Sequence, residues 1–190
     1  MTAAIPVVLV CGFRGAGKSS LIRNLVSLRP EGDVWGVIGP ANAIEPEAGL
    51  LQEPVPHGCP CCIGSVIFRA GLVQLIRRAG AANLKRILVE GGPDGHAGAT
   101  RTLVARTFTG IDLQVEQVIA VIDPRWIELP LPAARTAMEQ LVREADTVIA
   151  NKWDTAGAST RSTFSTWMRS LNRPSVSSIN GVPVDSEQNE

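Results

Sequence analysis

The chain has 190 residues, of which 45% are hydrophobic and 19% are charged, and its formal net charge is zero. This composition is typical of a globular domain with a substantial core, and it excludes an intrinsically disordered chain. The sequence contains no basic stripe and no apolar run of membrane-spanning length, so we expect neither a nucleic-acid partner nor a membrane partner.

Four cysteines are present, and Cys59, Cys61 and Cys62 lie together in one short stretch, apart from Cys11. The N-terminus lacks the basic segment of a signal peptide, so we expect a cytoplasmic protein. In a reducing compartment such clustering favours metal or redox chemistry over a disulfide framework.

Short apolar runs alternate along the chain with segments whose apolar residues recur at helical spacing, beginning with a strand at Val7–Val10 and a helix at Ser19–Leu28. Pro40–Pro56 is predicted to be a long working or mobile loop, because four prolines and three glutamates punctuate it. The other expected strands are Val34–Gly39, Arg86–Glu90, Val118–Asp123, Thr147–Ala150 and Ser175–Ile179, and helical faces are expected at Ile63–Ile76, Ala99–Thr107, Ala134–Val142 and Phe164–Leu171.

A glycine-rich turn joins the first strand to the first helix and reads Gly12-Phe13-Arg14-Gly15-Ala16-Gly17-Lys18-Ser19. This is the P-loop pattern, in which backbone N–H groups and the helix N-terminus surround a phosphate chain. Lys18 supplies charge to the β- and γ-phosphates, and the Ser19 hydroxyl is placed to ligate Mg²⁺. The nucleotide-binding residues predicted from this stretch are Gly12, Gly15, Ala16, Gly17, Lys18, Ser19 and Ser20.

Together the loop and the alternating pattern predict an α/β fold of the P-loop NTPase type, with a mostly parallel sheet of about six or seven strands and helices on both faces. We expect one domain over residues 1–183, with a polar tail over 184–190. Ligands bind beyond the carboxyl ends of the strands in such sheets. Because the candidate polar residues all follow strand ends, the pattern predicts one composite site.

A second motif, Asn151-Lys152-Trp153-Asp154, follows a buried strand and fits N-K-x-D. Guanine offers a ring N–H and an amine to one carboxylate, here Asp154, whereas adenine presents an acceptor there. Asn151 is expected to bond the base or to brace the loop. The stem of Lys152 is expected to lie on the ring, with Trp153 as an additional apolar cover.

The stretch His57-Gly58-Cys59-Pro60-Cys61-Cys62 is the most distinctive part of the sequence. Thiolates are soft ligands suited to Zn²⁺ or another transition metal, and His57 is a candidate fourth ligand. The alternatives are a redox thiol pair and small buried side chains. Three cysteines within four positions are hard to explain by packing, so we predict a metal site.

These motifs, with a strand ending in Glu90 and the run Val121-Ile122-Asp123, occur in the order seen in the CobW-like GTPases, which the chain resembles from about Pro6 to Leu171. The nickel-insertion GTPases belong to the same group. The resemblance implies a slow GTPase that acts as a zinc or cobalt metallochaperone for a client metalloprotein, with a homodimer as one assembly. By position, Lys18 and Ser19 would hold phosphate and Mg²⁺, Asn151 and Asp154 would read guanine, and Cys59, Cys61 and Cys62 would handle metal.

Three departures from the family pattern bear on the mechanism. The acidic segment expected after the second strand is replaced by Gly39-Pro40-Ala41-Asn42-Ala43, for which Glu45 and Glu47 are candidate substitutes. A proline, Pro93, stands where a glycine is expected to bond the γ-phosphate, and proline has no N–H. The chain also shows no C-terminal CobW domain, so we expect the GTPase domain only.

The remaining acids at strand ends, Glu90 and Asp123, are the candidates for the second shell of Mg²⁺. Lys18 and Glu90 form the predicted catalytic set. The leading hypothesis is a zinc-linked GTPase whose nucleotide state moves the adjacent cysteines. The alternatives are a nickel-insertion GTPase and a degenerate nucleotide-binding, metal-sensing module with little hydrolysis, which the missing acids and Pro93 favour.

Overall fold

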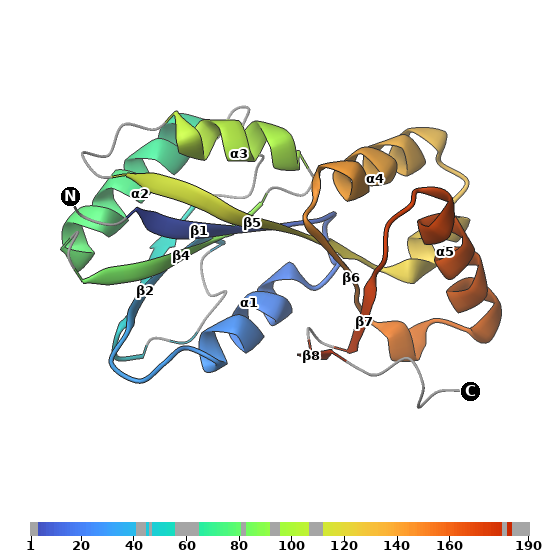
Figure 1. The fold of residues 1–190 in the computed structure, drawn as a ribbon, viewed down its shortest axis with the longest axis horizontal. Helices are drawn as coiled ribbons and strands as arrows, with labels where there is room; N and C mark the ends of the chain where they lie inside the picture. The colour runs from blue at the N-terminus through green and yellow to red at the C-terminus, as the bar shows by residue number, and fades with distance from the viewer. Residues whose placement is uncertain are drawn as a thin grey trace.

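The computed structural model describes residues 4–40, 45, 47–55, 65–80, 83–91, 96–106, 112–179 and 182–183. A twisted sheet runs through the molecule, and helices lie on either side of it (Figure 1). The strands are β1 (Ile5–Cys11), β2 (Val34–Gly39), β3 (Leu50–Pro54), β4 (Leu84–Glu90), β5 (Leu113–Ile122), β6 (Thr147–Ala150), β7 (Val176–Ile179) and β8 (Val182–Pro183). The helices are α1 (Lys18–Ser27), α2 (Ser65–Ala79), α3 (Ala97–Ala105), α4 (Pro132–Glu144) and α5 (Ala158–Ser170), with 3-10 turns η1 (Pro124–Glu128) and η2 (Trp153–Thr155).

The strand order within the described chain is β3-β2-β4-β1-β5-β6-β7-β8, and every neighbouring pair is parallel except the antiparallel β7–β8 pair. The mostly parallel α/β sheet predicted from the sequence is therefore confirmed. The chain moves from β1 to one side through β2 and later returns to β5 on the other side, so the order reverses at β1. Ligands of open parallel sheets bind at such a reversal, beyond the carboxyl ends of the strands.

The strands bury both faces, as their continuous apolar runs require. In β1, Val7 and Leu9 belong to one core cluster, and Val8 and Val10 belong to the cluster on the opposite face. Successive strand residues point to opposite faces, which produces this division. The sheet therefore holds the loop after β1 from behind with two separate cores.

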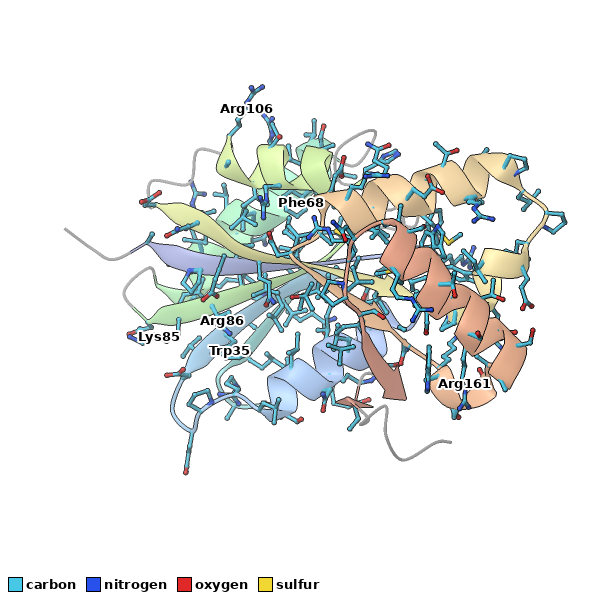
Figure 2. The ribbon with its side chains drawn as sticks, turned by 45° about the vertical axis from the view of Figure 1, so that its right-hand side comes forward. Trp35, Phe68, Lys85, Arg86, Arg106 and Arg161 are labelled. Carbon is cyan, nitrogen blue, oxygen red and sulfur yellow. The ribbon has the colours of Figure 1, made fainter. Side chains whose placement is uncertain are left out.

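The helices divide unequally between the two faces. Helix α1 covers one face with Leu21, Ile22 and Val26, and α2 to α5 contribute to the core on the other face. Phe68 of α2 is fully buried between its helix and the sheet (Figure 2). No described helix is both long enough and apolar enough to cross a lipid bilayer.

The prediction of a long loop over Pro40–Pro56 is wrong, because part of it forms strand β3 and pairs with β2. At the amino-terminal edge, Arg29 holds the start of this strand by donating to the carbonyls of Asp33 and Ala48 at 2.5 and 2.9 Å. Arg29 also pairs with Glu47 at 2.7 Å. Because β3 runs parallel to β2, Glu47 lies at the edge opposite the P-loop, which disfavours it as a substitute for the missing acids.

Candidate nucleotide site

The glycine-rich turn follows β1 and leads into α1. Gly15 and Gly17 have φ angles of 85° and 99°, in a region of backbone conformation that residues other than glycine rarely adopt. Gly17 is the N-cap of α1, and among the described residues no side chain caps this helix start. The first N–H groups and the positive end of the helix dipole therefore face the loop, which is the arrangement that binds phosphate.

Lys18, Ser19 and Glu90 form a cluster beside this turn. Glu90 ends β4, which pairs with β1 so that Val10 lies opposite Glu90. The Ser19 hydroxyl donates to Glu90 Oε2 at 2.8 Å, and Lys18 Nζ lies 3.8 Å from Glu90 Oε1. Lys18 Nζ also donates to the Phe13 carbonyl at 3.2 Å. Burial lowers the pKa of Lys18, and the Glu90 carboxylate opposes that shift.

The same cluster fits a hard cation. The Ser19 hydroxyl and the Glu90 carboxylate supply two oxygen donors side by side, the chemistry that Mg²⁺ prefers. Asp123, the other candidate acid for this role, is instead paired with Arg125 and with Lys152 of the N-K-x-D motif. Of the two strand-end acids, Glu90 is therefore the one in contact with Ser19.

The N-K-x-D motif is tied directly to the P-loop. Asn151 Nδ2 donates to the Ala16 carbonyl at 2.9 Å, and Lys152 Nζ donates to the Gly15 carbonyl at 2.5 Å. Two adjacent residues of the N-K-x-D loop therefore bond to two adjacent residues of the P-loop. Asn151 is 1% exposed, and a Cβ atom added to Gly17 would lie 2.0 Å from its Nδ2. This close approach explains why glycine is required at position 17.

The side chains that follow in this motif have different surroundings. Asp154 is exposed at η2, immediately after the loop that contacts the P-loop. Trp153 is buried and packs edge-on against Phe164, with the Arg161 guanidinium over its ring at 5.6 Å. The expectation that Trp153 covers the base is wrong, because its ring belongs to the core under α5.

Sequence reasoning missed one residue of this arrangement. Ser178, on β7, is buried and donates to Asn151 Oδ1 at 2.9 Å, so the Asn151 amide is held at both ends. Strand β7 reads Val-Ser-Ser-Ile, so the sequence does not distinguish Ser178 from the serine before it. Its partner lies on another strand, and that pairing is visible only in the folded chain.

The predicted metal ligands His57, Cys59, Cys61 and Cys62 lie outside the described residues, as does Pro93. Within the described ranges no three His, Cys, Asp or Glu side chains are grouped to hold a metal ion. Val55, the last residue described before the cysteines, donates its N–H to the Gly39 carbonyl at 2.8 Å.

Cys11, at the end of β1, is buried directly behind the P-loop. A Cβ atom added to Gly91 would lie 2.8 Å from its Sγ, so the thiol is closely packed. Burial raises the pKa of Cys11 to about 12, an effect that the charge of Lys18 partly offsets. This thiol is therefore protonated at neutral pH and is not a candidate nucleophile or metal ligand.

We expect this buried thiol to make the fold sensitive to alkaline pH. The unfolded chain loses the Cys11 proton near pH 9.0, while the folded chain keeps it to about pH 12. Raising the pH through this window therefore favours the unfolded chain. Denaturant unfolding of the native protein and of Cys11→Ala at pH 8 and above should give a steeper fall in free energy for the native protein. Equal slopes would contradict the assignment, since all other titrating groups are shared.

The reversal of strand order at β1, the glycine turn before α1 and the Asn151 loop against it define a P-loop nucleotide-binding domain. Residues 6–177 match the family described as CobW/HypB/UreG, nucleotide-binding domain. The chain belongs to this family.

The zinc chaperone YeiR of Escherichia coli (strain K12) is 24% identical over 166 residues, which cover 84% of this chain and 50% of YeiR. The chain thus spans about half the length of this curated relative.

Zinc-bound YjiA GTPase from E. coli has a TM-score of 0.53 at 18% identity, covering 97% of this chain and 60% of YjiA. Nickel-bound HypB from Helicobacter pylori has a TM-score of 0.58 at 12% identity, covering 93% of this chain and 80% of HypB. Chloroplast FtsY from Physcomitrella patens has a TM-score of 0.64 at 16% identity, covering 98% of this chain and 64% of FtsY. These structures establish a shared fold.

Proposed function

We propose that this chain is the GTP-binding and GTP-hydrolysing domain of a metallochaperone, in which the nucleotide state is coupled to the binding of zinc and its delivery to a client metalloprotein in the cytoplasm. Membership of the CobW/HypB/UreG family and similarity to a protein named as a zinc chaperone support this function. The observation that carries it is a short path of contacts from the phosphate side of the site to the residue that leads into the cysteines.

This path begins at Glu90. A Cβ atom added to Gly39 would lie 3.1 Å from the Glu90 Cβ, so the end of β2 lies beside this acid. The Gly39 carbonyl in turn accepts the N–H of Val55 at 2.8 Å. The close approach of Gly39 to Glu90 and one hydrogen bond therefore connect Glu90 to Val55, which precedes Cys59–Cys62 in the chain. A displacement of Glu90 therefore has a physical route to Val55, four residues before Cys59 in the sequence.

The phosphate side supplies the means of displacing Glu90. In the structure Lys18 is directed to the Phe13 carbonyl and to Glu90, and the Ser19 hydroxyl is directed to Glu90. A bound triphosphate offers Lys18 stronger acceptors, so Lys18 is expected to turn from Glu90 to the phosphates. Mg²⁺, held by Ser19 and Glu90, would neutralise phosphate charge. Because one acid serves both Lys18 and Ser19, we propose slow intrinsic hydrolysis.

The base and the cargo complete the assignment. Asp154 would accept the two donors of guanine, beside the Asn151 loop that is fixed on the P-loop. The cargo would bind the thiolates of Cys59, Cys61 and Cys62, with His57 as the fourth ligand. Three soft ligands and one imidazole suit Zn²⁺.

Zinc titration of the reduced protein tests this coupling. We expect affinities for zinc that differ at least about fivefold between protein with GTP, protein with GDP and protein without nucleotide, the lower end of typical coupling. Phosphate release followed in the same samples should be slow but measurable. Cys61→Ser should weaken zinc binding at least about tenfold, because a hydroxyl is a poor ligand for this metal.

The matched control is Cys11→Ala, which removes the buried cysteine of β1 and should leave zinc affinity unchanged. Equal zinc affinity in the three nucleotide states, or an unaffected Cys61→Ser, would overturn the metallochaperone assignment. Binding of nickel more tightly than zinc would reassign the cargo. Nucleotide binding without any phosphate release would overturn the hydrolytic part.

A further inference from the structure

The buried carboxylate at the end of β5 has no role in the function proposed so far. We propose that Asp123 is a positioning residue for the nucleotide base. It holds the Lys152 ammonium against the P-loop, so that the aliphatic stem of Lys152 forms one wall of the base site. This inference rests on the proposed guanine-nucleotide binding and extends it to a residue outside the motifs that contact nucleotide.

Asp123 is 1% exposed and is nevertheless surrounded by charge. Its Oδ2 accepts Arg125 Nη2 at 2.6 Å and lies 3.5 Å from Lys152 Nζ. Its Oδ1 accepts the backbone N–H and the Nε of Arg125, at 3.1 and 2.9 Å. Burial disfavours the ionised form, but the hydrogen bonds and charge of Arg125, with the charge of Lys152, hold the pKa of Asp123 below its ordinary value. The acid is therefore a fixed negative charge that both cations share.

Lys152 needs such an anchor because its backbone is unusual. Its φ and ψ angles are 60° and 37°, a left-handed conformation that lysine adopts at a cost in energy. Asn151, before it, is fixed on the P-loop, and Trp153, after it, is fixed in the core. These neighbours determine where the Lys152 side chain starts, and the Gly15 carbonyl with Asp123 determines where its ammonium ends.

As a consequence, the hydrocarbon stem of Lys152 runs from the loop that contains Asn151 to the P-loop. The stem begins two residues before Asp154, the carboxylate expected to read the guanine edge. An apolar stem with a fixed ammonium offers a flat surface to any purine ring. Asp123 should therefore affect how tightly a purine nucleotide binds, whereas Asp154 should affect which purine binds.

Arg125 provides the contrast that tests this assignment. It is half-exposed and shares Asp123 with Lys152, but it has no contact with the P-loop among those described. Arg125 also feels the charge of Asp154. If Asp123 acts through Lys152, removing Arg125 should weaken nucleotide binding less than removing the charge of Asp123 does. If Asp123 only supports the turn at η1 through Arg125, the two substitutions should have equal effects.

The experiment compares GDP and IDP binding by the native protein, Asp123→Asn, Lys152→Met and the double variant. Asn keeps an oxygen for the Arg125 N–H and removes the charge, and Met keeps an apolar stem and removes the ammonium. We expect each single variant to bind both nucleotides roughly tenfold more weakly, with the GDP to IDP ratio unchanged. The double variant should bind no more weakly than Lys152→Met, because the two residues act as one unit.

Two further variants serve as controls. Arg125→Gln should lose less GDP affinity than Asp123→Asn does. Asp146→Asn should bind GDP as the native protein does, because Asp146 lies before β6 at the opposite edge of the sheet, where it pairs with Arg101 and accepts the Val118 N–H. Thermal unfolding of each variant reports whether the fold is retained.

If the native protein binds GDP and Asp123→Asn binds it equally tightly, this inference alone is overturned. An additive loss of affinity in the double variant would also overturn it. Lys152→Met changes a partly exposed residue, so unchanged GDP binding by it overturns the inference even if Asp123→Asn does not fold. A native protein that binds no guanine nucleotide would instead overturn the proposed function.

Discussion

Replacing Gly17 by alanine should weaken GDP binding by roughly 100-fold, because two independent costs of a few kcal/mol arise at this position. The φ angle of 99° is strained for alanine, and the added Cβ would lie 2.0 Å from Asn151 Nδ2. Asn151 has no room to yield without losing its bonds to Ala16 and Ser178. Titration with a fluorescent GDP analogue measures this loss.

The matched control for this change is Gly32→Ala. Gly32 also has a positive φ, of 84°, but a Cβ atom there would meet nothing within 4 Å. This variant should lose about 1 kcal/mol of stability from the strained backbone and keep its nucleotide affinity. Binding by Gly17→Ala within threefold of the native protein would show that the Asn151 brace is not needed for the site.

Replacing Asp154 by asparagine should change the preferred base. The carboxylate that would accept the ring N–H and the amine of guanine becomes an amide with donors of its own. We expect GDP to bind roughly 100-fold more weakly, since hydrogen bonds to a charged group are lost. Xanthosine diphosphate, which carries a carbonyl in place of the amine, should gain affinity. Competition among GDP, xanthosine diphosphate and ADP measures the switch.

The control for the base switch is Asp112→Asn, an exposed acid just before β5 at the opposite edge of the sheet. It should keep the native order of preference. Retention of guanine preference by Asp154→Asn would refute the assignment of the base-reading residue, whatever the effect on overall affinity.

Most strands could be predicted because they are buried on both faces and read as continuous apolar runs. The bounds Val34–Gly39 and Thr147–Ala150 agree with the structure to the residue. Strand β3 could not be predicted in this way, since Leu50–Pro54 is a half-buried edge strand that contains polar residues and ends in proline. Its place is set by pairing with β2 and by Arg29, and neither contact is local in sequence.

The candidate site likewise has parts that the sequence predicts and parts that depend on contacts between distant strands. The P-loop and the N-K-x-D motif are local patterns, and the sequence predicted that they would meet at one edge. The sequence could not predict which part of the site each acid would contact. Glu90 faces Ser19 and Asp123 faces Lys152 because β4 and β5 flank β1 on opposite sides. Both acids follow apolar strands, so only the strand order separates their roles.

The chain on both sides of the cysteine stretch is held before any metal arrives, since Val55 bonds to Gly39 and α2 begins at Ser65 and buries Phe68. The entropy of bringing the two ends together is therefore lost when the sheet folds. In zinc fingers, by contrast, metal binding and folding are one event. On the proposed function, the free energy of metal binding is not required for folding here, and a cargo can leave without unfolding its carrier.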